Sequence, residues 1–231
     1  MLDAGKISAI TIDLDDTLWP IWPVIERAEK ALHHWLTLHA PMAAALYSSP
    51  PALREIRDEM SRMRPDLKGD MSALRRESIR LALYRAGEDP LLAAPAFEAF
   101  FAERQRVTLF EDALPALEFL AARYPVVALT NGNADVQRIG LGRFFHASIN
   151  AREFGVGKPD PRIFHAAAGA MDVMPERVLH IGDDATLDAL GALNAGMQAA
   201  WLNRGDQPWP HAQEPHVTVE HLSELVALFP W

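Results

Sequence analysis

Short apolar runs alternate with helical patterns over much of the chain, and several of these runs end in polar residues. The first run, residues 8–12, is rich in β-branched side chains, which suits a buried strand. After residue 111, similar runs alternate with helical segments, as is typical of a parallel sheet. The later strands are expected at residues 126–129, 147–149, 178–181, 198–201 and 217–219, with helices near 115–123, 135–140, 161–171 and 185–195.

Residues 22–108 carry a different pattern, with apolar residues at helical spacing and no convincing strand. Proline and glycine residues divide this region into its predicted helices. These helices are expected at residues 24–39, 51–63, 71–86 and 91–106. The first strand precedes this region and its expected sheet partners follow it. We therefore predict an α/β domain formed by residues 1–21 and 109–231, interrupted by an inserted all-helical domain.

Composition narrows the class of protein. With 231 residues, 49% hydrophobic and 23% charged, the chain is long enough for a full core and a second small domain. No apolar run approaches the roughly 18 residues of a membrane span, and no signal peptide is recognised, so a cytoplasmic location without a membrane partner is expected. The absence of cysteine excludes disulfides, thiolate zinc sites and cysteine nucleophiles. A net charge of −9 argues against a nucleic-acid partner. Composition does not specify the oligomeric state.

Three aspartates, Asp13, Asp15 and Asp16, directly follow the first predicted strand. Carboxylates this close would repel one another in a dry interior, so a cation is expected beside them. Side chains two positions apart on an extended strand point to the same side, which makes Asp13 and Asp15 a pair with room for two roles. Ligands of open α/β sheets bind beyond the carboxyl ends of the strands, so the reaction site is expected here.

Polar residues also follow two later strands. Thr130 and Asn131 come after the run at residues 126–129 and can offer hydrogen-bond donors to an anion. Asp183 and Asp184 come after the run at residues 178–181, and Asp188 lies one turn further. Oxygen ligands of this kind are those that Mg²⁺ prefers.

One lysine stands out by its setting. Lys158 lies within a loop rich in glycine and proline, residues 155–161, just before a predicted helix that Pro161 can begin. An ammonium group fixed in such a loop can neutralise a carboxylate or a phosphoryl oxygen.

These segments together resemble the four motifs of the haloacid dehalogenase-like (HAD) hydrolases. Residues 13–17 are similar to the first motif, D-x-D-x-T, and Thr130 stands at the second. Residues 155–161 resemble the third motif, G-K-P-D/E-P, and residues 182–188 the fourth, G-D-x-x-x-x-D. The motifs occur in the family's order, and the helical region lies between the first two, as in members with a C1 cap. The resemblance implies a Rossmann-like core and a phosphatase.

The resemblance also implies a role for each motif. Asp13 would attack phosphorus to form an aspartyl-phosphate, and Asp15 would protonate the leaving group and later activate water. Thr130 and backbone amides near Asn131 would hold the phosphoryl group, while Lys158 balances its charge. The expected cofactor is Mg²⁺, and its expected ligands are Asp13, the Asp15 carbonyl and Asp183. Asp184 or Asp188 would act through water or orient Lys158.

Three alternatives to a phosphatase remain open. A 2-haloacid dehalogenase of the same superfamily uses an equivalent carboxylate nucleophile, although that branch usually lacks a counterpart of Asp15 and needs no metal. A phosphosugar mutase retains both motif-one aspartates. A non-enzymatic binding protein on the same fold is the third alternative, although no catalytic position has been replaced.

The substrate is expected to be a small phosphorylated metabolite. Residues around the motifs look like those of bacterial phosphatases that act on flavin mononucleotide and on the phosphoribitylaminouracil precursor of riboflavin. That similarity is loosest in the helical region, where substrate choice resides. The flat flavin or uracil ring of such a substrate is well matched by an aromatic face or a guanidinium plane. We therefore hypothesise that Trp22 and one of Arg75 or Arg76 select the substrate.

Overall fold

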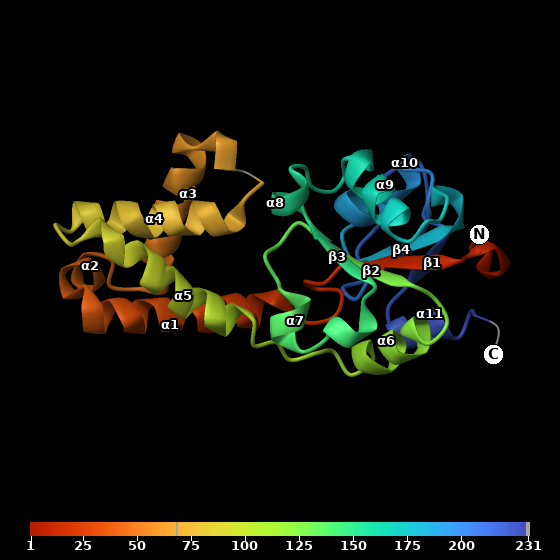
Figure 1. Cartoon of the computed structure of the whole chain (residues 1–231), viewed down its shortest axis with the longest axis horizontal. Coiled ribbons are helices and arrows are strands. Elements are labelled where there is room, and N and C mark those ends of the chain that lie inside the picture. Colours follow the sequence, from red (N-terminus) through yellow and green to blue (C-terminus); the bar gives the residue numbers. More distant parts are fainter. Residues whose placement is uncertain (68, 230–231) are drawn as a thin grey trace. The chain divides into compact units, whose positions relative to one another are not determined.

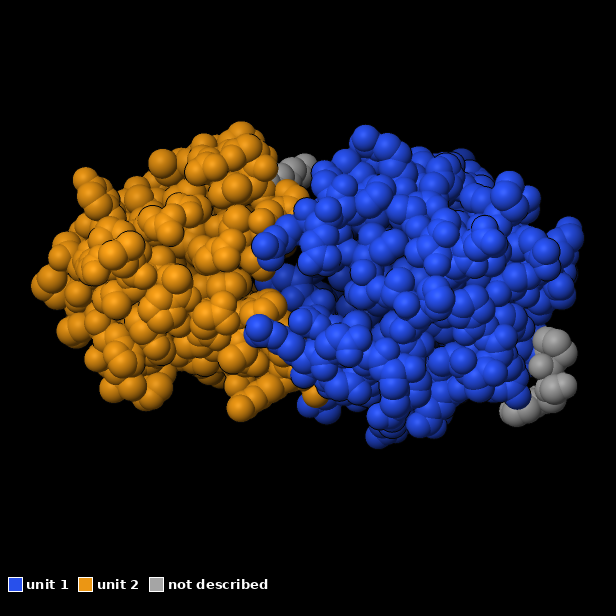
Figure 2. All heavy atoms as spheres, in the orientation of Figure 1, with its two compact units in different colours: residues 1–20, 108–231 blue, residues 21–107 orange. Residues whose placement is uncertain are grey.

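The computed structural model describes residues 1–67 and 69–229. The chain forms two compact units, shown in Figure 2. Unit 1 consists of Met1–Pro20 and Thr108–Trp231, and unit 2 of Ile21–Val107. Each boundary of unit 2 lies one residue before the boundary expected from the sequence. Among the described residues, no helix has the length and apolar character needed to cross a membrane.

Unit 1 is built on a parallel sheet that has six strands within the described residues. The strands are β1 (Ala9–Ile12), β2 (Val126–Thr130), β3 (Ala147–Asn150), β4 (Val178–Gly182), β5 (Gln198–Leu202) and β6 (Val217–Val219). Their order is β3-β2-β1-β4-β5-β6. Figure 1 labels β1 to β4 of this sheet. Every residue of β1, β2, β4 and β5 is buried. Both faces of such a sheet are covered, which explains why these strands appear as continuous apolar runs. The predicted α/β fold is confirmed.

Helices cover both faces of this sheet. Helices α9 and α10 lie on one face, and α6 and α11 on the other (Figure 1). The helices of unit 1 are α6 (Ala113–Ala121), α7 (Val136–Ile139), α8 (Ala151–Phe154), α9 (Pro161–Ala170), α10 (Gly191–Asn194) and α11 (Leu222–Val226). The single helix expected at residues 185–195 is instead a π-helical turn, Ala185–Leu190, followed by α10. The short helices α8 and α11 were not expected, because four or five residues carry too little periodicity to be recognised.

Unit 2 contains helices and no strand among the described residues. The helices are α1 (Ile21–His39), α2 (Pro41–Leu46), α3 (Pro50–Met63), α4 (Met71–Arg85) and α5 (Ala93–Arg104). Helix α1 begins three residues earlier than expected, since its first turn accommodates Pro23 without losing an intrahelical hydrogen bond. Helix α2 was not expected. Apolar side chains of several helices form the core of the unit, among them Leu32, Ile79 and Phe97.

The register of the central strands determines where the motif residues meet. Ile12 of β1 pairs with Ala128 of β2 on one side and with Ile181 of β4 on the other. Beyond the strand, the backbone N–H of Asp13 donates to the carbonyl of Ile181 at 2.9 Å. The carboxyl ends of β1, β2 and β4 therefore meet at one edge of the sheet.

Candidate active site

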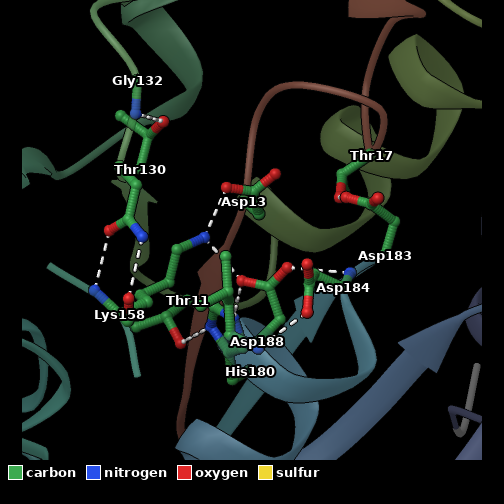
Figure 3. Close-up of polar contacts among 12 residues, drawn as sticks. Thr11, Asp13, Thr17, Thr130, Gly132, Lys158, His180, Asp183, Asp184 and Asp188 are labelled. Carbon is green, nitrogen blue, oxygen red and sulfur yellow. Dashed lines mark hydrogen bonds and ion pairs between the residues drawn. The ribbon is translucent and has the colours of Figure 1, made fainter. Parts of the chain in front are cut away.

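A pocket of about 190 Å³ opens at this edge of the sheet, and the described residues that line it belong to unit 1. The lining residues are Asp13, Asp15, Thr130, Asn131, Gly132, Lys158, Asp183, Asp184, Leu187 and Asp188. The structure thus brings together every site residue that the sequence predicted within unit 1. Figure 3 shows most of these side chains and their polar contacts.

Lys158 joins two carboxylates in this pocket. Its Nζ atom lies 2.5 Å from Oδ1 of Asp13 and 2.5 Å from Oδ1 of Asp188 (Figure 3). Burial lowers the pKa of the ammonium group, but the two carboxylates outweigh this effect, and the pKa of Lys158 lies above its usual value. Lys158 therefore remains charged and supplies the positive charge that the acidic cluster needs.

The backbone of Lys158 is held by the side chain of Asn131. The Asn131 oxygen Oδ1 accepts from the Lys158 N–H at 2.7 Å, and its Nδ2 donates to the Lys158 carbonyl at 2.8 Å. A Cβ atom at Gly157 would lie 2.5 Å from Asn131 Oδ1, so the close approach requires glycine. The Asn131 side chain thus orients the lysine loop. Thr130 is buried, and its Oγ1 accepts from the Gly132 N–H at 2.9 Å.

Three buried or partly buried carboxylates form a potential metal site. Oxygen atoms of Asp13, Asp183 and Asp188 all lie within 4.8 Å of one another. Burial raises the pKa of Asp13 well above its usual value, although Lys158 opposes the rise. Burial and the neighbouring Asp188 raise the pKa of Asp183 to about 7. A bound cation would relieve this repulsion, and an all-oxygen donor set fits a hard divalent ion.

Asp184 and Asp188 have different surroundings. Asp184 caps the turn that follows β4, where its Oδ1 accepts from the N–H groups of Thr186 and Leu187, both at 2.8 Å. Asp188 is buried, and its Oδ2 accepts from the Asp184 N–H at 3.1 Å, while its Oδ1 faces Lys158. Burial raises the pKa of Asp188, but Lys158 and His180 outweigh it and lower the value to about 2. These contacts suit Asp188 for orienting Lys158.

His180 and Thr11 extend this network into the sheet, and sequence reasoning missed both. His180 is fully buried, with Nε2 3.1 Å from Asp188 Oδ1 and Nδ1 2.9 Å from Thr11 Oγ1. Burial lowers the pKa of His180. A neutral ring then donates from Nε2 to Asp188 and accepts the Thr11 hydroxyl at Nδ1. The available signal was a histidine inside an apolar strand, because a buried polar side chain needs a partner.

Two further residues of the segment after β1 contact the acidic cluster. The indole Nε1 of Trp19 donates to Oδ1 of Asp15 at 2.9 Å. The hydroxyl of Thr17 donates to Oδ1 of Asp183 at 3.1 Å (Figure 3). Each of these donors fixes one oxygen of an acidic side chain, and neither was predicted from the sequence.

The predicted specificity residues lie in unit 2. Arg75 is buried, with Nη1 3.6 Å from Glu29 Oε1 and its guanidinium carbon 4.2 Å from the Phe100 ring centre. Burial lowers the pKa of Arg75 to about 10. The guanidinium carbon of Arg76 lies 5.3 Å from the centre of the Phe97 ring. Both arginines therefore have aromatic partners within the unit, and Arg75 belongs to its buried interior.

Trp22 has a different environment from the two arginines. Its side chain is 54% exposed, and the guanidinium carbon of Arg54 lies 4.8 Å from its ring centre. Arg54 also forms an ion pair with Glu29 at 2.6 Å. Trp22 thus offers an accessible aromatic ring supported by a cation.

Comparison with known proteins agrees with this fold. Residues 7–196 match the family model of haloacid dehalogenase-like hydrolases, to which the chain therefore belongs. It is 34% identical to the 5-amino-6-(5-phospho-D-ribitylamino)uracil phosphatase YigB of Escherichia coli, over 97% of each chain. It is also 38% identical to the phosphoserine phosphatase of Thermus thermophilus, over 65% of this chain and 63% of that protein. Within its family, the chain is thus a HAD-like phosphatase, as the four motifs predicted.

A similar solved structure carries a different name. The 2-haloacid dehalogenase from Pseudomonas syringae pv. tomato matches with a TM-score of 0.86 and 38% identity, over 95% of this chain and 96% of that one. This likeness supports the fold and the family.

Proposed function

We propose that the chain is a Mg²⁺-dependent phosphomonoester hydrolase that forms an aspartyl-phosphate on Asp13. The observation that carries this proposal is the placement of Asp13 in the pocket, 2.5 Å from the ammonium group of Lys158 and within the cluster that contains Asp183. A nucleophilic carboxylate must be ionised, and Lys158 favours the ionised form against the effect of burial. We propose residues 1–21 and 109–231 as the catalytic domain and residues 22–108 as its substrate-selecting cap.

In the first step, an oxygen of Asp13 attacks phosphorus while the bond from phosphorus to the leaving oxygen breaks. Asp15 donates its proton to that oxygen and becomes a carboxylate. Lys158 balances charge on the phosphoryl oxygens, and Thr130 together with backbone amides near Asn131 holds the group. Asp13, the Asp15 carbonyl and Asp183 would hold Mg²⁺, which supplies further positive charge to the phosphoryl group when bound.

In the second step, Asp15 takes a proton from water. The water oxygen bonds to phosphorus, and the bond between phosphorus and Asp13 breaks, which releases inorganic phosphate and restores the free Asp13 carboxylate. Asp15 is then protonated again, as the next cycle requires. Asp13 acts as the nucleophile and Asp15 transfers the protons, so the two side chains need different partners. The contacts of Asp13 with Lys158 and of Asp15 with Trp19 support this division of roles.

The size of the pocket supports a small phosphorylated metabolite as substrate. At about 190 Å³ it is smaller than the pockets of roughly 300–1,000 Å³ that enclose drug-sized ligands. It suits a phosphoryl group, whose leaving group would extend beyond it. Given the likeness to the Escherichia coli enzyme, we propose flavin mononucleotide and the phosphoribitylaminouracil precursor of riboflavin as the first substrates to test. Trp22 is the specificity residue best supported by its exposed ring.

A 2-haloacid dehalogenase is the second candidate, favoured by the similar solved structure with that name. Two observations weigh against it. Asp15 provides a second carboxylate for which that reaction has no proton-transfer role, and the oxygen cluster of Asp13, Asp183 and Asp188 suits a divalent cation. Metal-independent release of chloride from 2-chloropropionate would favour the dehalogenase.

A direct test measures phosphate release from a panel of phosphomonoesters, including flavin mononucleotide, sugar phosphates and nucleotides. Removal of metal with EDTA should stop turnover, Mg²⁺ should restore it, and the larger Ca²⁺ should support it poorly. Asp13→Asn should abolish turnover and the acid-stable phosphoenzyme trapped by rapid quenching. Asp172→Asn is the matched control, since Asp172 is exposed and asparagine tolerates its left-handed backbone. Full activity of Asp13→Asn, with deamidation excluded by mass spectrometry, would contradict the proposal.

A further inference from the structure

We propose that Trp19 is a positioning residue for Asp15, and that its indole N–H holds the carboxyl group which protonates the leaving oxygen. This inference rests on the proposed function, since it requires Asp15 to transfer a proton as the bond from phosphorus to the leaving oxygen breaks. Its basis is a contact between two residues four positions apart, in the segment that follows β1.

The burial of Trp19 fixes the direction of its hydrogen bond. The side chain is completely buried, so the ring has one packed orientation. An indole N–H is only a donor, and a buried one requires an acceptor. Oδ1 of Asp15 provides it at 2.9 Å. A large ring that cannot turn therefore determines where one oxygen of Asp15 lies.

The backbone between the two residues is also fixed. Asp16 adopts a left-handed conformation with φ of 58°, and its N–H donates to the Trp19 carbonyl at 2.8 Å. The Leu18 N–H donates to the Leu14 carbonyl at 2.8 Å. The Leu18 carbonyl in turn accepts from the N–H of Phe110, where the chain returns to unit 1, at 2.9 Å. Trp19 thus stands on a closed turn and can act as a rigid support.

The type of donor matters for the chemistry. Lys158 places a full positive charge beside Asp13, which suits a nucleophile that must stay ionised. The indole of Trp19 is a neutral donor, so its hydrogen bond orients Asp15 without adding a positive charge beside it, which suits a group that must give up a proton in one step and take one in the next. General acid catalysis depends on the distance and angle to the leaving oxygen, and a support of this kind maintains both.

The test compares leaving groups in the variant Trp19→Phe, which keeps an aromatic ring and removes the N–H. The measured quantity is kcat/KM, because it reports the step that forms the phosphoenzyme. For glycerol 2-phosphate, whose alkoxide needs a proton, we expect a loss of about tenfold, a part of the 10²–10⁴-fold that general acid catalysis provides. For p-nitrophenyl phosphate, whose leaving group hardly needs a proton, kcat/KM should stay within about twofold of the wild-type value.

Three further variants complete the design. Asp15→Asn should show the same dependence on the leaving group with a larger loss, and adding Trp19→Phe to it should cause no further selective loss, because the supported group is gone. Trp35→Phe is the matched control, since Trp35 lies in unit 2, where its ring centre is 4.4 Å from that of His39. It should leave kcat/KM unchanged for both substrates.

Equal losses of Trp19→Phe on both substrates, or no loss on either, would overturn the inference while the proposed function stands. If Asp15→Asn itself shows no dependence on the leaving group, the acid role of Asp15 and the inference fail together. Circular dichroism and thermal unfolding will show whether Trp19→Phe is folded. If it is not, 3-benzothienylalanine at position 19 keeps the bicyclic shape without the N–H, and the same comparison of leaving groups decides the question.

Discussion

Lys158 Nζ lies 2.5 Å from Asp13 Oδ1, although 145 positions separate the two residues in the sequence. The contact joins the loop before α9 to the end of β1, and both residues are buried. Because Lys158 is the cation that the structure places against Asp13, removal of its charge should affect both catalysis and folding.

We predict that Lys158→Met, which keeps most of the side-chain volume, lowers kcat/KM for phosphomonoesters by at least about 100-fold, in the range found for loss of one preorganised electrostatic contact. It should also lower the free energy of unfolding by about 3–5 kcal/mol, because Asp13 and Asp188 remain buried without their cation. Steady-state kinetics and urea unfolding measure the two effects. Near wild-type kinetics in Lys158→Met would remove Lys158 from the mechanism.

The raised pKa of Asp183 predicts an unusual pH dependence for the metal-free protein. The pKa is about 7 in the folded chain and 3.8 ordinarily, so between these values the folded state binds more protons than the unfolded state. In EDTA, the contribution of Asp183 should therefore lower the free energy of unfolding as pH rises from about 4 to 7. Asp183→Asn should show a smaller fall over the same range, and Mg²⁺ should restore wild-type stability near pH 8. Identical pH profiles for the two proteins in EDTA would refute the assignment.

The contact between Thr11 and His180 predicts that a nearly isosteric substitution of Thr11 lowers the free energy of unfolding. Thr11→Val removes the hydroxyl that meets Nδ1 of the buried histidine and should cost about 1–3 kcal/mol of unfolding free energy, as expected for a buried group left unpaired. Thr218→Val is the control, because Thr218 is exposed on β6, and its effect should stay within about 0.5 kcal/mol. Urea unfolding compares the two variants. A cost no larger than that of the control would show that His180 does not depend on Thr11.

The exposed ring of Trp22 predicts a selective effect on substrate binding. Trp22→Ala should raise KM for flavin mononucleotide by about fivefold to tenfold, the value of one aromatic contact. Hydrolysis of p-nitrophenyl phosphate, with its small leaving group, should change little. Parallel losses on both substrates would mean that Trp22 supports the fold, and unchanged KM values would place the specificity surface elsewhere in unit 2.

Arg75 should behave differently from Trp22. Its guanidinium is buried against Glu29 and the Phe100 ring, so Arg75→Ala should reduce stability by about 1–3 kcal/mol through a charged group left poorly paired. Thermal and urea unfolding measure this cost. The ratio of kcat/KM for flavin mononucleotide to that for p-nitrophenyl phosphate should stay constant. A change in this ratio at unaltered stability would restore Arg75 to substrate selection.

Local pattern was sufficient to predict the sheet and most of the pocket. Parallel strands with both faces covered are continuous apolar runs, so β1, β2, β4 and β5 could be recognised without a structure. Residues at the carboxyl ends of neighbouring parallel strands must meet at one edge, which is why Asp13, Thr130 and Asp183 could be assigned to one site. The pattern did not reveal α2, α8 and α11, because their four to six residues are too short for periodicity.

The sequence by itself determined the residue types at the site and their order along the chain, because strand periodicity and the four motifs are local properties. Only the tertiary structure decided which atoms they contact. Asn131 holds the Lys158 backbone, His180 meets Asp188, and Trp19 supports Asp15. These contacts depend on strand register, on the path of loops and on the packing of one ring. The sequence likewise could not predict whether Arg75 is exposed or buried, because a guanidinium group can face solvent or pair with a carboxylate. The packing of the helices in unit 2 buries it beside Glu29.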